Sequence, residues 1–157
     1  MTRPIMARQV DDGDSGVTAV SARPSPVNDY ADVGPIATTE EFKAALLATR
    51  DWIGISPTQL QMLQAQCRAP DATITAAQLA DQLKFKNFAA ARLQYGTLAR
   101  AVADKLGYAP PQKGKGPVRW WFALSIAQDG HDDAGDGQFK WTMRPELVAA
   151  LRAMKWA

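Results

Sequence analysis

Basic side chains gather in one stretch of the sequence, and their chemistry is that of phosphate binding. Between residues 84 and 119 the chain carries eight Lys and Arg against the single acid Asp104, a local net charge of +7 compared with +2 for the whole chain. Such a cluster is typical of a nucleic-acid-binding surface, and also of a merely solvated helix face. Asn, Gln and Arg can in addition hydrogen-bond to base edges. The candidate contact residues are Lys84, Lys86, Asn87, Arg92, Gln94, Arg100, Lys113, Lys115 and Arg119.

Few residues could carry catalysis or hold a metal ion. One cysteine, Cys67, and one histidine, His131, exclude an internal disulfide and the usual Cys/His zinc sites. The acidic segment 129–137 fits a calcium loop poorly, because Ala134 stands where glycine is required and no Glu closes the loop. A catalytic role for Cys67 would need a base, and the only histidine lies in that acidic loop. We therefore expect a protein that is not an enzyme and has no cofactor or metal site.

The elements that carry the basic residues are predicted to be mostly helical. Three helices should begin at capping boxes, in which Ser or Thr is followed three residues later by Glu or Gln; the pairs are Thr38 with Glu41, Ser56 with Gln59 and Thr75 with Gln78. A longer helix is expected from Asn87, a capping residue, to Gly107, a terminating one. Gly96 inside it costs about 1 kcal/mol relative to alanine and suggests a kink or a close backbone approach. A last helix should start at Pro145.

Two strands are predicted between the long helix and the last one. Apolar residues alternate over residues 118–127, which places Trp120 on the inward face and Trp121 on the opposite face. Residues 138–143 alternate too, with Trp141 on the apolar face. The predicted fold is mainly α with a small antiparallel β-hairpin (α+β).

This order of elements is that of a winged helix-turn-helix. The helix after Thr75 would be the positioning helix, residues 84–87 the turn, and the helix from Phe88 the one that enters the major groove. Asn87, Arg92 and Gln94 would then meet base edges.

The remaining basic residues would contact the phosphate backbone. The acidic loop 129–137, at the tip of the hairpin, would be repelled by phosphate, so the basic loop before the first strand is the better candidate for backbone contact. The expected phosphate contacts are Lys84, Lys86, Arg100, Lys113 and Lys115, with Arg119 beside them.

Three segments carry a resemblance to a known family: "ITAAQLADQLKFKNFAAARLQYGTLARAVADKLGY", "RWWFALSIAQD" and "FKWTMRPELVAALRAMKW". Together they resemble a winged-helix-like domain found at the N-terminus of bacterial HNH-type restriction endonucleases, over about residues 57–156. The most specific pieces are "LQYGTLA" and "WTMRPEL". The resemblance implies a DNA-targeting accessory domain whose partner is double-stranded DNA, modified DNA included. An HNH nuclease needs at least two histidines, and this chain has only His131, so no nuclease activity is carried over.

The remaining features of the sequence predict how the chain is divided and where it is located. Residues 1–37 are rich in Asp, Gly, Ser and Pro and are expected to form a disordered leader before a domain at 38–157. No apolar run is long enough to span a bilayer and the N-terminus has no apolar stretch typical of a secretory signal, which predicts a cytoplasmic protein without a membrane partner.

The sequence thus leads to two hypotheses of different classes. The first is a non-enzymatic DNA-binding protein, either a regulator or the separate specificity part of a restriction or defence system. The second is a protein-interaction module that uses exposed tryptophans, namely Trp52, Trp121 or Trp156, together with the acidic loop.

Overall fold

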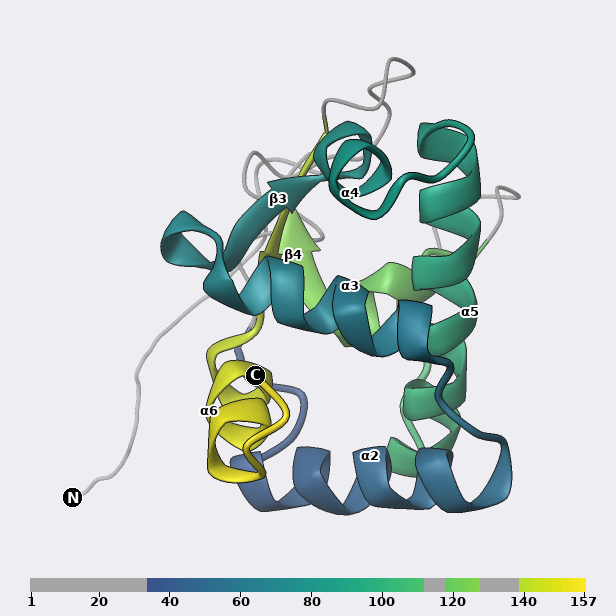
Figure 1. Ribbon diagram of the computed structural model, residues 1–157. Coiled ribbons are helices and arrows are strands. Elements are labelled where there is room, and N and C mark those ends of the chain that lie inside the picture. Colours follow the sequence, from purple (N-terminus) through teal and green to yellow (C-terminus); the bar gives the residue numbers. More distant parts are fainter. Residues whose placement is uncertain (1–33, 112–117, 128–138) are drawn as a thin grey trace, which may run out of the picture.

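The computed structural model describes residues 34–111, 118–127 and 139–157, so Lys113, Lys115, the acidic loop and most of the predicted leader lie outside the described residues. The described part is mainly helical with one small antiparallel sheet, which confirms the predicted α+β class. Its elements, shown in Figure 1, are α2 (Thr39–Trp52), α3 (Pro57–Arg68), the 3-10 turn η2 (Pro70–Ala72), β3 (Thr73–Thr75), α4 (Ala76–Leu83), α5 (Phe88–Leu106), the 3-10 turn η3 (Trp120–Ala123), β4 (Ser125–Ala127), β5 (Lys140–Met143) and α6 (Pro145–Ala153).

The helices begin where the sequence predicts. All three capping boxes form, with both reciprocal hydrogen bonds present at the starts of α2, α3 and α4. Asn87 caps α5, where its side chain accepts from the Ala90 N–H at 2.9 Å, and Gly107 ends that helix with a left-handed φ of 69°. Local side-chain chemistry therefore sets these boundaries.

The sheet has three strands instead of the predicted two. Its order is β3-β5-β4, and both neighbouring pairs are antiparallel. β3 was missed because it is only three residues long and its last residue, Thr75, is also the cap of α4. Ile74 pairs with Trp141, and the hydroxyls of Thr73 and Thr142 lie 2.8 Å apart across the two strands.

The first predicted strand is a second correction. Residues Trp120–Ala123 form the 3-10 turn η3, and only Ser125–Ala127 is strand. The turn breaks the alternation of faces, so the burial is the reverse of the prediction: Trp121 is 7% exposed and Trp120 is half-buried. The cause is tertiary, because η3 packs between α5 and β4 instead of extending the sheet.

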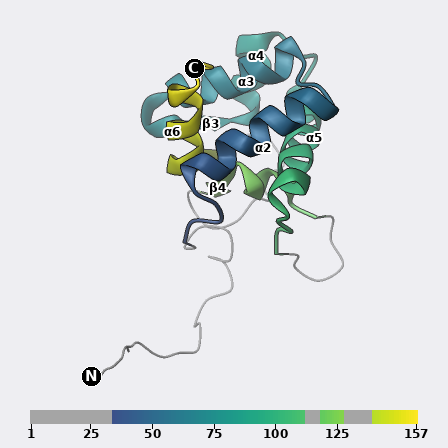
Figure 2. The same cartoon turned by 90° about the horizontal axis from the view of Figure 1, so that it is seen from below.

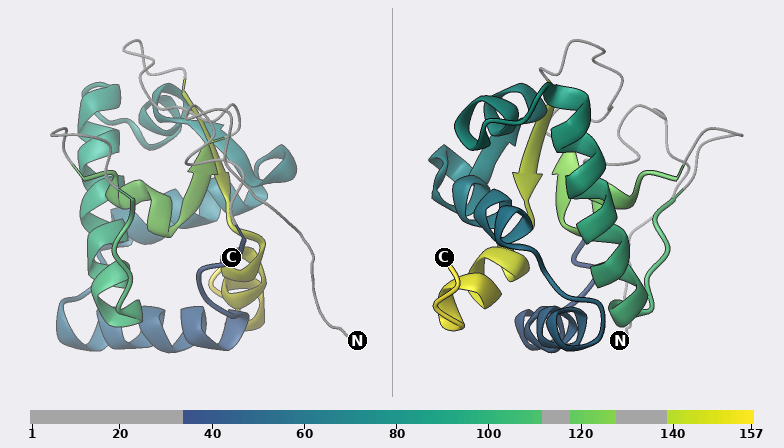
Figure 3. Two further views of the ribbon diagram at one scale, coloured as in Figure 1. Left: turned by 180° about the vertical axis from the view of Figure 1, so that it is seen from behind. Right: turned by 45° about the vertical axis from the view of Figure 1, so that its right-hand side comes forward.

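The helices surround the sheet in a simple arrangement. α2 lies across one end of the domain and packs against both α5 and α6 (Figures 1 and 2). α4 packs against α5 at the other end. The strands lie between α3 and α4 on one side and α5 on the other (Figure 3). Ile36 and Ala37, which the sequence assigns to the leader, pack against the core.

A buried ring of hydrogen bonds joins α3, α5 and β4. The Tyr95 hydroxyl donates to Gln66 Oε1 at 2.6 Å, and Gln66 Nε2 donates to Ser125 Oγ at 2.9 Å. Ser125 Oγ lies 2.5 Å from the Tyr95 hydroxyl, and because Tyr95 has already given its one hydrogen to Gln66, Ser125 is the donor there. Gln66 Nε2 also donates to the Trp141 carbonyl at 3.2 Å, which extends the ring to β5.

Replacing Tyr95→Phe should lower the free energy of unfolding at neutral pH by about 1–3 kcal/mol, because a buried amide oxygen loses its donor. Burial raises the pKa of Tyr95 above its ordinary value of 10.0. Above about pH 10 the unfolded chain releases this proton and the native state keeps it, so native stability falls as pH rises, by about 1.4 kcal/mol per pH unit.

Urea unfolding between pH 7 and pH 11 measures both effects. The wild type should lose stability more steeply above pH 10 than Tyr95→Phe does. Thr97→Ala, at an exposed hydroxyl on the same helix, is the control and should change stability by no more than about 0.5 kcal/mol. Equal slopes for wild type and Tyr95→Phe would contradict the prediction.

Candidate nucleic-acid interface

A four-residue turn carries the first predicted contact residues. α4 ends at Lys84, which adopts a left-handed conformation with φ 61°, and the Phe85 N–H bonds back to the Ala80 carbonyl at 2.9 Å. Lys84, Lys86 and Asn87 are exposed in this turn. The packing of α4 against α5 therefore presents two lysines at the start of the long helix.

Asn87 has less freedom to contact a base than the sequence suggests. Its side-chain oxygen is occupied by the cap of α5, so only the amide nitrogen is left to donate. The two-point contact to adenine expected of asparagine needs both groups. Asn87 is thus first a structural residue of the turn.

α5 has one buried and one exposed side. The buried stripe packs on the core and consists of Ala91, Tyr95, Leu98, Ala99, Val102 and Ala103. Arg92 and Arg100 are exposed, two turns apart on one stripe, and Leu93 beside them is 68% exposed. Gln94 follows Arg92 by two residues, about 200° around the helix, and is half-buried, so it does not share the face of Arg92.

The turn η3 and the residue before it bring two further residues to this side of α5. Arg119 and Trp120 lie with Arg92 around a pocket of about 360 Å³, whose other wall is α5. The Arg100 guanidinium lies 5.0 Å from the centre of the Trp120 ring, within the range of a cation–π interaction. The structure therefore brings three of the predicted basic residues, Arg92, Arg100 and Arg119, to one face.

Arg144, the residue directly before α6, fixes the position of η3 through buried contacts. Its side chain is 3% exposed, and its Nε and Nη2 both donate to the Phe122 carbonyl, at 3.0 and 2.9 Å. The guanidinium also lies 4.6 Å from the centre of the Phe122 ring. Burial lowers the pKa of Arg144 below its ordinary value, and the nearby Tyr108, Glu146 and Tyr95 act against that shift. A buried cation is thus used to fix the turn that carries Trp120.

The sequence missed several residues of this face. Leu93, Gly96 and Trp120 border the pocket, and only the assignment of η3 as a strand hid the last of them. A Cβ placed on Gly96 would meet no atom of the described residues within 4 Å, so within them the close backbone approach suggested for this glycine is not found.

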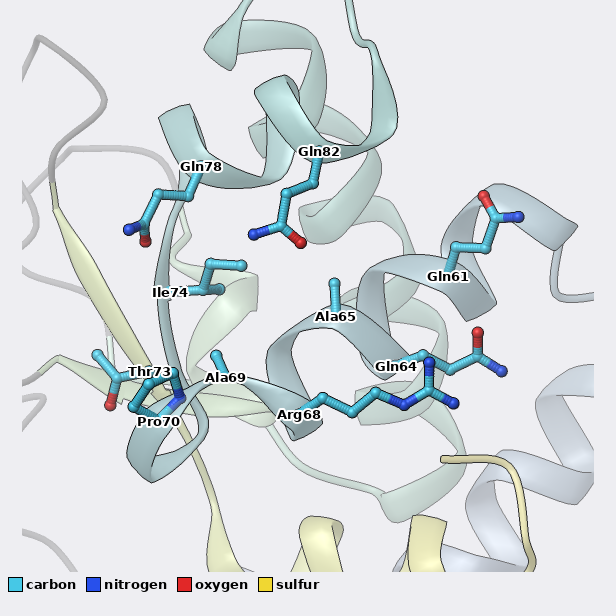
Figure 4. A pocket seen from close by; sticks show the side chains of 10 residues that line it. All are labelled: Gln61, Gln64, Ala65, Arg68, Ala69, Pro70, Thr73, Ile74, Gln78 and Gln82. Atoms are coloured by element: carbon cyan, nitrogen blue, oxygen red, sulfur yellow. The ribbon is translucent and has the colours of Figure 1, made fainter.

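A second pocket, of about 440 Å³, lies between α3, β3 and α4 (Figure 4). Gln61 and Gln64 line it from α3 and Gln78 and Gln82 from α4, and Arg68 is the only charged residue among the described residues around it. Two of the amides already have partners: Gln78 belongs to the capping box of α4, and Gln64 donates to the Trp156 carbonyl at 2.8 Å. Amides without an acid, base or nucleophile nearby offer polar contacts and no evident catalysis.

Other chemistry finds little support in the described ranges. Within them no group of three or more His, Cys, Asp and Glu side chains is placed to hold a metal ion. Cys67 is buried in the core. Among the helices that the structure describes, none is both long and apolar enough to cross a membrane.

Lys84→Gly should raise the free energy of unfolding by about 1 kcal/mol, because glycine adopts the left-handed conformation without the cost that a Cβ brings. Lys84→Ala removes the same charge and keeps that cost, so it is the matched comparison. Chemical denaturation measures both variants. Equal stability of the two would show that the turn is not strained.

Comparison with known proteins adds no relative. The chain matches no protein-family model, no curated protein and no solved structure. The resemblance to a domain of HNH-type endonucleases therefore stays a prediction, and a function has to be argued from the geometry of this chain.

Proposed function

We propose that this protein binds double-stranded DNA as a winged helix-turn-helix, with α5 as the recognition helix. The observation that carries the proposal is the basic face of α5 and η3, formed by Arg92, Arg100 and Arg119. Lys84 and Lys86 are exposed in the turn directly before the same helix. Arginine and lysine on one exposed face supply the phosphate contacts that duplex binding needs.

The topology supports the proposal. The helix pair α4–α5 is joined by a short turn and is followed by β4 and β5, and the last of these strands also pairs with β3, which precedes the helix pair. A helix pair closed by such a small sheet is the arrangement of winged helix-turn-helix domains.

The exposed side of α5 also fits the groove it would enter. The major groove, about 12 Å wide, admits one α-helix. Arg92 lies in the first half of α5, where a recognition helix contacts base edges, and the exposed Leu93 could meet a thymine methyl group. The sequence resemblance adds a narrower role, as a regulator or as the specificity part of a restriction or defence system.

Binding should be strongly salt-dependent, because each neutralised phosphate releases counterions. Fluorescence anisotropy with a labelled duplex over a series of salt concentrations measures affinity and salt slope together. The double variant Lys86→Ala/Arg92→Ala should weaken binding and lower the salt slope by about 2. No binding of the wild type to any duplex at low salt would overturn the proposal.

The matched control removes two positive charges elsewhere. Arg152 and Lys155 are exposed at the end of α6, away from α5 (Figure 1). Arg152→Ala/Lys155→Ala should keep the wild-type affinity and salt slope, apart from a small loss of affinity that follows from the lower net charge. If both double variants weaken binding equally, the interaction follows total charge and the assigned face is wrong.

One observation favours the second hypothesis, a protein-interaction module. Trp52 is 80% exposed at the end of α2, with the Lys105 ammonium 5.3 Å from the centre of its ring, and Ile53 beside it is also exposed. Trp121 cannot serve such a surface because it is buried, and Trp156 is half-buried. An interaction surface would therefore centre on Trp52.

Trp52→Ala should leave duplex affinity unchanged, since Trp52 lies at the end of α5 opposite to Arg92. Pull-down from lysate treated with nuclease separates the two hypotheses. A protein captured by the wild type after that treatment and lost in Trp52→Ala would establish the second function. Loss of all captured protein on nuclease treatment would refute it.

A further inference from the structure

We propose that the pocket between α5 and η3 holds one unpaired nucleobase of a nucleotide, with its phosphate beside Arg92. As far as that nucleotide belongs to bound DNA, the inference rests on the proposed function. The class of ligand, a planar ring with an attached anionic group, is inferred from the residues that line the pocket and does not depend on the proposed function.

The pocket combines aromatic walls with positive charge. Three tryptophans, Trp120, Trp121 and Trp141, line it together with Arg92 and Arg119, and its remaining described residues are apolar or glycine. No carboxylate is among the described residues that line it, and Arg92 is exposed there, so the described lining favours an anionic over a cationic ligand. Trp120 is the least buried of the three tryptophans and is the one on which a flat ring could stack, while Trp121 and Trp141 form the buried floor. Phosphate pairs with arginine, which makes a nucleotide the best-matched ligand. The volume, about 360 Å³, lies in the range of small-ligand sites.

Gly96 gives an independent reason to regard the pocket as a binding site. It lies in the interior of a 19-residue helix, where glycine is destabilising relative to alanine. Neither its backbone conformation nor the packing of the described residues requires it: its φ is not among the positive ones, and a Cβ there would meet no atom of the described residues within 4 Å. The missing side chain leaves open space in the pocket that Gly96 itself lines. The glycine therefore costs helix stability while it keeps this part of the pocket open.

Two features prepare the tryptophans for a ligand. Arg100 lies over the Trp120 ring without lining the pocket, so it holds that ring from outside. Trp141 stacks on Tyr95 with ring centres 4.4 Å apart, which fixes its orientation. The buried Nε1 of Trp141 is the one buried side-chain polar atom of the described residues that has no hydrogen-bond partner. The ring of Trp141 is therefore held by stacking and packing, without a hydrogen bond from its indole nitrogen.

The test uses one labelled duplex in three forms: fully paired, with one extra adenine nucleotide bulged out, and with the same extra nucleotide lacking its base. Anisotropy at low salt should show the adenine bulge bound roughly ten-fold more tightly than the baseless bulge, the scale of one base stacked on an aromatic side chain. A second arm titrates deoxyadenosine monophosphate and follows tryptophan fluorescence, which detects a free nucleotide as the source.

The sharpest variant is Gly96→Leu, which adds bulk to the pocket at a position where a Cβ would meet no described atom within 4 Å and where leucine favours the helix. It should bind the adenine bulge and the baseless bulge with about equal affinity. It should also abolish the quenching of tryptophan fluorescence by the nucleotide. Trp120→Ala should do the same. Trp52→Ala, the removal of an exposed tryptophan on α2, is the matched control and should keep both signals. Circular dichroism and thermal unfolding confirm that each variant is folded.

The outcomes separate the inference from the proposed function. Equal binding of all three duplexes without nucleotide quenching overturns the pocket assignment and leaves duplex binding intact. Quenching without any duplex binding supports the pocket, assigns it to a free nucleotide and refutes the proposed function. A base preference or quenching that survives in Gly96→Leu places the ligand elsewhere and overturns the inference.

Discussion

The closed ring of hydrogen bonds among Gln66, Tyr95 and Ser125 is the constraint on which the rest of the structure depends. The side chains of Gln66, Tyr95 and Ser125 are buried in the core, where an unpaired polar group would destabilise the fold. Each of the three is hydrogen-bonded by the other two. The ring allows one relative position of α3, α5 and β4, since hydrogen bonds are directional and hydrophobic contacts are not. It thereby fixes which side of α5 is turned toward solvent.

The candidate site depends on a second polar anchor as well. The hydrogen-bond ring orients α5, whereas Arg144 holds η3 through the Phe122 carbonyl. Arg92 lies on α5 and Trp120 on η3, so the basic face and its pocket form where these two elements pack together. This division explains why α6, which contributes no residue to that face, still matters for its shape: the anchor Arg144 is the residue that directly precedes it.

The features predictable from the sequence are those governed by neighbours in the chain. A Ser or Thr and a Gln three residues later determine a helix start almost alone, and the cap at Asn87 and the stop at Gly107 follow the same logic. β3 and η3 were missed because an element of three or four residues is too short to show a hydrophobic period. Tertiary packing decides the conformation of such short segments. For the site, residue type predicted a basic α5, but the pocket depends on a 3-10 turn that reverses Trp120 and Trp121. Only tertiary contacts settle that reversal.

The shortness of the strands has a consequence for solubility at high concentration. β3 and β4 form the two edges of the sheet, and each is three residues long. An edge strand with unpaired backbone groups is a template on which other chains aggregate, and a template of three residues offers very few hydrogen bonds to a newcomer. β3 is further limited because Thr75 turns the chain directly into α4. Within the described residues, strands this short form a sheet for the core and offer other copies few backbone groups with which to pair.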